Sequence, residues 1–433
     1  MRAQVLSRSV VSRGVAMALT VAMVMVAGCV VEEEDGPNRG NNNTGGGSIT
    51  TGWYDRNPSA ANFTVSTAAH LVGLAELVNG GNSFEGKTIT MANDISLSAY
   101  NAANTAFNNG RGWVPIGNAS NRPFSGIFNG NDHVVSGLFF NHNTSDRIGL
   151  FGTLNGTVKN LGVVDVDIFG RGNVGALAGF VGGDASVDNC YSTGLVRGAG
   201  NGVGGLIGQF SGAMQNCYST ATLSGINSVG GLMGENSSGS ISTSYSTGAV
   251  NGTNYVGGLV GSHRGTLANC YSTSTVRGSN AVGGLIGHIS ATTSVTNCYA
   301  TGDVGGESRV GGIAGANGGV MTLALSAALN PNLNINAASG FARVAPFATL
   351  TNGATGGRIS GCVALIDMNH NGEAMEWTQK DASHQNGADI VADDIHSDPT
   401  MGNRFTELNG WTLVPGYLPG LFGVPVEMPA HLR

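Results

Sequence analysis

A six-residue phrase recurs along the middle of the chain at nearly constant spacing. It reads VGALAG from Val174, and it returns as VGGLIG, VGGLMG, VGGLVG, VGGLIG and VGGIAG from Val203, Val229, Val256, Val282 and Val310. The copies begin 29, 26, 27, 26 and 28 residues apart. A similar string that is one residue shorter, IGLFG, begins at Ile148. A repeat of this length indicates a stack of similar units, because one unit is too small to bury its own apolar residues.

A second recurring string follows each of the first five copies of the six-residue phrase at a similar distance. It reads VDNCYSTGLV, MQNCYSTATL, ISTSYSTGAV, LANCYSTSTV and VTNCYATGDV. Val, Ile, Thr and Tyr favour strands, Gly, Asn and Ser favour turns, and 71 of the 433 residues are Gly. The unit has no helical periodicity, and it has room for three strands of about five residues each. We therefore predict an all-β fold, a single-stranded, right-handed parallel β-helix (a β-solenoid) with coils about 4.8 Å apart.

Stacking places equivalent residues over one another, so each repeat position becomes a file along the solenoid. Val229 and Leu232, with their equivalents, are expected inside. A further apolar file is expected at Val196, Leu223, Val250, Val276 and Val304. An amide ladder, in which each Asn bonds the next, is expected at Asn189, Asn216, Asn269 and Asn297.

The ends of such a stack need covers, because an open end exposes strand edges and core. A helix is predicted at residues 68–78, capped by Ser66 or Thr67 and stopped by Asn79 and Gly80. We expect this helix to close the N-terminal end, and Trp377, Trp411 and the segment LVPGYLPGLFGVP to close the other. The expected divisions are 53–147 for the cap and lead-in coils, 148–320 for the repeats and 321–433 for the last coils and C-terminal cap.

The N-terminal residues predict a secretion signal rather than a part of the folded domain. Three Arg precede a short apolar run that ends in VAGC at Cys29, which resembles a bacterial lipobox. That resemblance implies a signal peptide at 1–28, lipid on Cys29 as the membrane contact, and a bacterial outer-membrane or cell-surface location. The alternative is an ordinary secretory signal cut before a Cys. Residues 29–52 are predicted to be a flexible tether, because they are rich in acidic residues, Asn and Gly.

The repeats resemble the GLUG-motif family of bacterial surface proteins. The resemblance rests on VGGLVG and extends to the lead-in WVPIG from Trp113 and the exit RISGCVAL from Arg358. It implies a surface-exposed, adhesin-like lipoprotein. Some members are IgA-specific metallopeptidases with a HExxH zinc site, and that string does not occur here. The resemblance therefore implies no protease activity.

Two acidic stretches are candidates for chemistry. Asp165 and Asp167 lie two apart, and paired carboxylates can cleave glycosides. The favoured interpretation is that Val164, Val166 and Ile168 point inward and the Asp pair faces water. Asp367, Asn369 and Asn371 match the start of a calcium loop, but Thr378 stands where its last ligand, a Glu, is needed. A hairpin turning at Asn371-Gly372 is the favoured interpretation.

Cys190, Cys217, Cys270 and Cys298 occupy one phase of the repeat. Free, buried thiols are favoured, with bridges 190–217 and 270–298 as the alternative. His263 and His288 follow their VGGLxG strands, and we expect both on the surface.

The net charge of −7 argues against a nucleic-acid partner. No catalytic residues, metal or cofactor are predicted. The sequence predicts a non-catalytic adhesin or structural surface module with a glycan or surface protein as ligand. The alternative is a polysaccharide-degrading β-helix enzyme that uses the Asp165 and Asp167 region.

Overall fold

The computed structural model describes residues 51–290, 292–336, 340–346 and 357–433. The chain divides into two units, 1–42 and 43–433, and every described residue belongs to the second. Cys29, the predicted signal peptide and the predicted tether as far as residue 50 lie outside the described residues.

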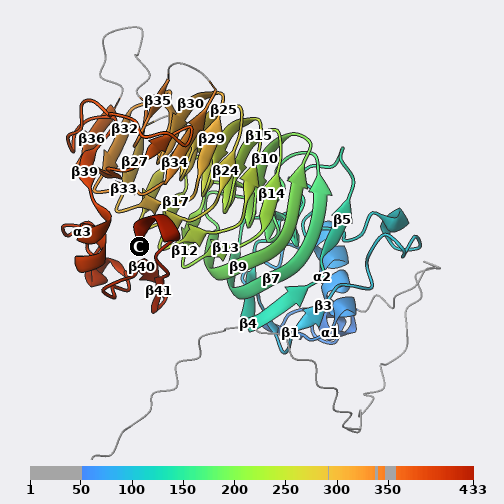
Figure 1. The fold of residues 1–433 in the computed structure, drawn as a ribbon. Helices are drawn as coiled ribbons and strands as arrows, with labels where there is room; N and C mark the ends of the chain where they lie inside the picture. The colour runs from blue at the N-terminus through green and yellow to red at the C-terminus, as the bar shows by residue number, and fades with distance from the viewer. Residues whose placement is uncertain (1–50, 291, 337–339, 347–356) are drawn as a thin grey trace, which may run out of the picture. The chain divides into compact units, whose positions relative to one another are not determined.

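The described chain is a parallel β-solenoid, as predicted, and successive coils stack side by side (Figure 1). Equivalent residues pair in register: Val203 lies beside Val229, Val229 beside Val256, and Val256 beside Val282. Among the described residues every pairing of named strands is parallel except one C-terminal hairpin. The handedness of the solenoid stays a prediction.

Three sheets run along the solenoid. One consists of β6 (Phe151–Leu154), β8 (Ala178–Val181), β11 (Ile207–Phe210), β16 (Met233–Asn236), β21 (Val260–His263), β26 (Ile286–Ile289) and β31 (Ala314–Asn317). A second consists of β10 (Asn201–Gly204), β15 (Asn227–Gly230), β20 (Asn254–Gly257), β25 (Asn280–Gly283), β30 (Ser308–Gly311) and β35 (Phe341–Ala342).

The third and largest sheet mixes long and short strands in its first part and has only short strands after it. Its first strands are β1 (Asn62–Val65), β2 (Thr88–Met91), β3 (Ile95–Ser96), β4 (Ile127–Ser136), β5 (Phe139–Asn141), β7 (Thr157–Gly170) and β9 (Ser186–Gly198). Each later coil then contributes three segments of this sheet.

The first segments are β12 (Ala213–Gln215), β17 (Ser240–Ser242), β22 (Thr266–Ala268), β27 (Thr293–Thr296), β32 (Met321–Ala324) and β36 (Gly357–Ser360). The second are β13 (Tyr218–Ser219), β18 (Tyr245–Ser246), β23 (Tyr271–Ser272), β28 (Tyr299–Ala300), β33 (Ala327–Ala328) and β37 (Val363–Leu365). The third are β14 (Thr222–Ser224), β19 (Val250–Asn251), β24 (Val276–Arg277), β29 (Val304–Gly306), β34 (Asn332–Ile335) and β38 (Asn369–His370), and β39 (Ala388–Ile390) pairs with β37. A repeat coil thus holds five short strands rather than the predicted three, because corners interrupt the third sheet.

The core confirms the predicted files. Val229 and Leu232 are fully buried, and so are Val196, Leu223, Val250, Val276 and Val304. Two adjacent glycines in five of the six copies allow close approach: a Cβ on Gly258 would lie 2.0 Å from the carbonyl oxygen of Gly284 in the next coil. The repeated phrase therefore combines buried apolar side chains with small residues at close contacts, which are Gly in most copies and Ala176 in the first.

The N-terminal end carries the predicted helix. Helix α2 (Ala68–Asn79) begins at Thr67, whose side chain accepts a hydrogen bond from His70 N, and Gly80 is its C-cap. It buries Leu71, Leu74 and Val78, and it lies at the N-terminal end of the coils (Figure 1). The short helices α1 (Gly52–Asp55) and η1 (Asn108–Gly110) belong to the same lead-in part.

Near the C-terminal end of the coils, a buried arginine, Arg343, bonds the residues around Gly387. The Arg343 side chain is fully buried, and it donates to the carbonyl oxygens of Asn386, Gly387 and Leu365 and to the Asp389 carboxylate at 2.8–3.2 Å. Trp377 packs over this guanidinium group at 5.9 Å. Trp377 thus covers this end, as predicted.

The predicted end position of Trp411 and the Pro-rich segment is wrong. These residues follow α3 (Ala392–Ser397) and η2 (Glu407–Asn409), form the hairpin β40 (Leu418–Leu421) and β41 (Val424–Val426), and precede η3 (Ala430–Leu432). They pack along the side of the solenoid, where the coils offer a row of aromatic rings. Within the described ranges, no helix has the length and hydropathy of a membrane span.

Candidate functional site: a groove beside a tyrosine ladder

Five tyrosines form a continuous stack on one side of the solenoid. These are Tyr191, Tyr218, Tyr245, Tyr271 and Tyr299, one from each coil and in register. Neighbouring ring centroids are 4.9, 4.8, 4.7 and 5.0 Å apart, and neighbouring planes are within 5° of parallel. We call this set the tyrosine ladder. The coil spacing imposes face-to-face stacking, because identical residues repeat at the distance between parallel strands.

A corner before each tyrosine directs the ring outward. The corner residues Asn189, Asn216, Thr243, Asn269 and Asn297 have left-handed φ values of 44–56°. Asn tolerates that conformation better than most residues do, which explains its recurrence here. The next residue in each coil, Cys or Ser, points into the core, and the tyrosine after it points out.

Residues 405–426, which we call the C-terminal segment, cover part of the tyrosine ladder. The hydroxyl of Tyr299 donates to Pro419 O at 2.6 Å, and the Trp411 ring lies 5.7 Å from Tyr299 and 6.2 Å from Tyr271. Phe422, at the hairpin tip, lies 5.8 Å from Tyr245 and 6.3 Å from Tyr218. Tyr299 and Tyr271 are therefore buried, whereas Tyr245, Tyr218 and Tyr191 stay partly exposed.

A groove of about 320 Å³ opens where this cover ends. Its apolar wall comes from the ladder and the hairpin tip, through Tyr191, Tyr218, Tyr245, Phe422 and Val424. Its polar wall comes from Asp132, Asn160 and Asn189. An apolar surface with a few fixed polar groups is typical of a ligand site.

The polar wall is preorganised by amide hydrogen bonds. Asn189 Nδ2 donates to Asn160 Oδ1 at 3.0 Å, and Asn160 Nδ2 donates to Asn129 Oδ1 at 3.3 Å. Asp132 Oδ1 lies 3.5 Å from Asn189 Nδ2. The wall therefore offers both donors and acceptors at fixed positions.

The tyrosine hydroxyls keep their protons at neutral pH. Burial, with a smaller contribution from Tyr191, raises the pKa of Tyr218 to about 12. Burial first, and then the charge of Asp94, raises the pKa of Tyr191. The groove thus presents neutral phenols.

The predicted amide ladder is interrupted. Asn189 bonds Asn160, but Asn216 bonds Asp188 and Thr243, and Asn297 bonds the backbone of Arg404. A second, unpredicted file bonds from coil to coil, with Asn227 donating to Asn201 at 2.9 Å and Asn254 donating to Asn227 at 2.8 Å. These residues begin strands in exact register, which aligns their amides, whereas Thr243 breaks the first file.

Asp165 and Asp167 do not share a regular strand face. Asp165 has a φ of 53° at a bulge, which buries Val163 rather than Val164. Both carboxylates are exposed, as predicted, and Asp167 forms an ion pair with Arg197. Val166 and Ile168 are buried as predicted.

The hairpin at Asn371-Gly372 is confirmed. His370 and Glu373 exchange two backbone hydrogen bonds, and Asn371 and Gly372 have φ values of 54° and 80°. The Asn371 side chain pairs with the backbone of Ile335 in both directions, at 2.5 and 2.8 Å. In the described part of the chain no three His, Cys, Asp or Glu side chains gather as metal ligands would.

The cysteines of the repeat, Cys190, Cys217, Cys270 and Cys298, are free and buried, and so is Cys362. Burial raises the pKa of the Cys217 and Cys270 thiols, so they stay protonated and unreactive. The alternative disulfides 190–217 and 270–298 are not formed in the structure.

The surface prediction is wrong for His263, whereas His288 is partly exposed. His263 is fully buried and accepts from Asn236 Nδ2 at 3.2 Å, because the last residue of β21 points into the core. Burial lowers its pKa to about 4. His288 is partly buried and stacks on Tyr255 with centroids 4.5 Å apart.

Comparison with known proteins confirms the repeat. The GLUG motif matches residues 252–277 and 278–305. Halomucin of Haloquadratum walsbyi is 32% identical over 152 residues, which are 34% of this chain and 2% of that protein. A protein of Evansella cellulosilytica named "Putative Gly-rich membrane protein" is 37% identical over 122 residues, 27% of this chain and 13% of that protein. The matched region thus spans a small part of both relatives.

Among solved structures, the chain is similar to one titled "Crystal structure of a putative immunoglobulin A1 protease from Bacteroides ovatus". The TM-score is 0.43 at 20% identity, covering 85% of this chain and 92% of that one.

The groove residues Tyr191, Tyr218 and Phe422 were missed by sequence reasoning. A signal for the tyrosines was present, since Tyr keeps one position in five successive copies of the second phrase. No repeat marks Phe422, because it reaches the ladder only through the return of the C-terminal segment.

Proposed function

We propose that this protein is a non-catalytic bacterial surface module, anchored through lipid on Cys29, that binds a glycan in the groove beside the tyrosine ladder. The groove is the observation that carries the proposal. Sugar rings have apolar C–H faces and many hydroxyls, and the groove combines phenol and phenyl groups with fixed amide and carboxylate groups. The names of the relatives, a mucin-like name and a membrane protein, support a surface location.

The surroundings of the carboxylates support a binding role over glycoside cleavage. Asp167 is engaged by Arg197, and Asp165 is exposed on a bulge. Glycoside hydrolysis needs an acid and a base or nucleophile on either side of one bond. Asp132 is the acidic side chain that lines the groove.

A glycan array with the mature protein tests the binding. We expect hits among neutral oligosaccharides, because the groove walls hold neutral phenols and amides. F422A should weaken binding about tenfold through the lost ring contact, and N189G should weaken it while keeping the left-handed corner. L408A is the matched control, since Leu408 is 98% exposed on the same C-terminal segment.

Two outcomes contradict this part of the proposal. Glycan hits that F422A and N189G leave unchanged place the ligand elsewhere. Shortening of a polysaccharide by the purified protein overturns the non-catalytic role.

Anchoring has its own test. In a bacterial host, the wild-type chain should carry lipid and fractionate with the outer membrane, whereas C29S should carry no lipid and be lost from the outer-membrane fraction. A wild-type protein without lipid by mass spectrometry contradicts the anchor and leaves the groove untouched.

A further inference from the structure

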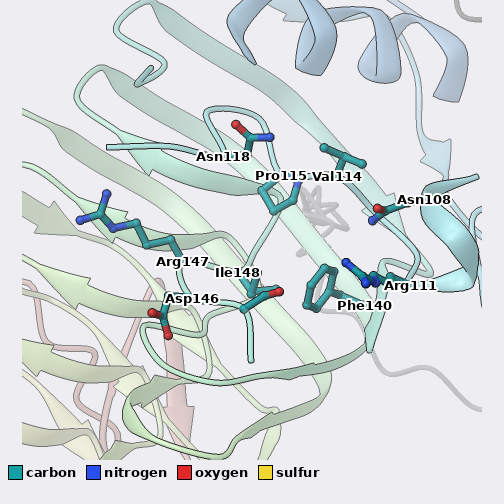
Figure 2. Close-up of a pocket in the computed structure, with 10 residues that line it drawn as sticks. Asn108, Arg111, Val114, Pro115, Asn118, Phe140, Asp146, Arg147 and Ile148 are labelled. Carbon is teal, nitrogen blue, oxygen red and sulfur yellow. The ribbon is translucent and has the colours of Figure 1, made fainter. Parts of the chain in front are cut away.

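A second pocket, of about 310 Å³, lies in the lead-in coils (Figure 2). Apolar side chains, Val114, Pro115, Phe140 and Ile148, form part of its lining, and Arg111 and Arg147 line it as well. In Figure 2 the two guanidinium groups lie at opposite ends, with Phe140 and Ile148 between them. None of these residues lines the groove beside the tyrosine ladder.

Backbone hydrogen bonds fix both walls of this pocket. On one side, Asn141 N donates to Arg111 O at 2.9 Å, and Trp113 N donates to Phe139 O at 2.8 Å. On the other, Arg147 N donates to Gly172 O at 3.0 Å, and the Arg147 guanidinium lies 5.2 Å from the centre of the Phe180 ring. The arginines therefore start from ordered backbone, which limits the entropy lost when a ligand binds.

The charge of the pocket is positive, although the chain as a whole carries −7. Its one acidic lining residue, Asp146, is held by Arg171 through Nε at 2.7 Å and through a second nitrogen, and by Gly172 N at 3.0 Å. These contacts, the Arg171 hydrogen bond first, lower the pKa of Asp146. Within the described ranges, neither Arg111 nor Arg147 forms an ion pair, although the Arg147 charge also lowers the pKa of Asp146, less than Arg171 and Gly172 do.

We infer that this pocket binds an acidic oligosaccharide, with its carboxylate or sulfate groups on Arg111 and Arg147 and a sugar ring against Val114, the half-buried apolar residue of the lining. Arginine is well suited to such groups, because its planar fork donates two parallel hydrogen bonds. Asn108, Asn118 and Ser145 also line the pocket and would serve the hydroxyls. The inference rests on the proposed glycan-binding function and extends it from neutral to anionic sugars.

Binding of the full mature protein to oligogalacturonate, dextran sulfate and uncharged dextran oligosaccharides tests this inference. Calorimetry at two salt concentrations should show binding of at least one acidic probe that weakens as salt rises. R111Q and R147Q should each weaken this binding about tenfold or more, because each removes one guanidinium charge and its charge-assisted hydrogen bonds. R147K should retain part of the affinity, since it keeps the charge but loses the fork.

The control is R277Q, which removes a partly exposed arginine from a repeat coil and should leave the affinity unchanged. Oligogalacturonate and dextran sulfate distinguish a carboxylate from a sulfate ligand. The inference is overturned if neither acidic probe binds, or if R111Q and R147Q both bind like the wild type. If neutral glycans still bind and F422A weakens that binding, the proposed function stands without this inference.

Discussion

At the scale of single residues, the glycines of the repeated phrase fix how closely coils can stack. A Cβ at Gly258 would lie 2.0 Å from Gly284 O and 2.3 Å from Ser272 Oγ. The backbone on both sides of this oxygen is fixed, because Gly283 O accepts from Gly258 N and Leu285 O accepts from Leu259 N. We therefore expect G258A to lower the free energy of unfolding by about 3 kcal/mol or more, measured by urea denaturation.

Gly183 provides the control for that substitution. It is exposed, and a Cβ there would meet nothing within 4 Å. G183A should change the free energy of unfolding by less than about 0.5 kcal/mol. Equal effects of G183A and G258A would mean that backbone entropy, rather than close approach, explains the glycines.

His263 makes the solenoid sensitive to acid. Its folded-state pKa, about 4, lies below the ordinary value of 6.5, because burial disfavours the charged ring. The folded state therefore binds a proton at His263 less readily than the unfolded state does. The folding free energy that depends on the neutral ring is fully present above pH 6.5 and is lost as the pH falls toward 4. The full loss is about 3 kcal/mol.

The matched variant is H263N, because Asn236 holds the same position in the preceding coil. Thermal melts at pH 7.5 and pH 4.5 should show a larger decrease in Tm for the wild type than for H263N. Identical decreases in the two proteins would show that the imidazole is not the acid-sensitive group.

At the scale of elements, the tyrosine ladder links the coils to the C-terminal segment. Each central ring contacts two neighbouring rings, and a stacked pair contributes about 0.5–1.5 kcal/mol beyond burial. The stack extends through five coils, and the C-terminal segment contacts four of its rings. The ladder therefore holds the C-terminal segment in place as well as joining the coils.

Alkaline pH should weaken this element first. The folded-state pKa of Tyr218 is about 12, and those of Tyr245, Tyr271 and Tyr299 are also raised, mainly by burial. Since the folded state holds these protons more tightly, the stability they contribute is present below pH 10 and is lost as the pH rises from 10 through 12.

Absorbance titration of the phenols and near-UV circular dichroism check this prediction. Phenolate formation by the ladder should coincide with the loss of tertiary signal above pH 10. Y245F, which keeps the ring and removes one ionisable hydroxyl, should shift the transition to higher pH. A transition unaltered in Y245F would contradict the role of the ladder.

Sequence alone predicted the coil but not the segments that pack on it. Repeats determine register, so Val229 and Leu232 could be placed inside, and the Thr67 cap and Asn371-Gly372 turn follow from local chemistry. His263 could not be placed, because its register neighbours, Asn236 and Ile289, differ in polarity. Phe422 and Trp411 could not be placed either, since the tyrosines they contact are more than a hundred residues away in the sequence and their own positions follow no period.

At the scale of the whole described chain, contacts between coils and contacts of the C-terminal segment respond differently to a change in the number of coils. Coils contact their nearest neighbours, and such stacks tolerate loss of a unit. The C-terminal segment instead spans several coils, with Trp411 on Tyr271 and Tyr299 and Phe422 on Tyr245 and Tyr218. The groove exists because the hairpin tip of this segment, at Phe422, reaches Tyr218 and leaves Tyr191 uncovered.

Deleting one coil should therefore close the groove without unfolding the protein. Removal of residues 227–253 joins Ile226 to Asn254, which already pairs in register with Asn227. Tyr218 then takes the place of Tyr245, and Phe422 advances onto Tyr191. We expect Tm to fall by less than about 10 °C, because one nearest-neighbour interface replaces two. Glycan binding should be lost, while Trp411 fluorescence stays as in the wild type because its two tyrosines are unchanged. A folded deletion variant that binds glycan at wild-type affinity would show that the position of the segment's end does not define the site.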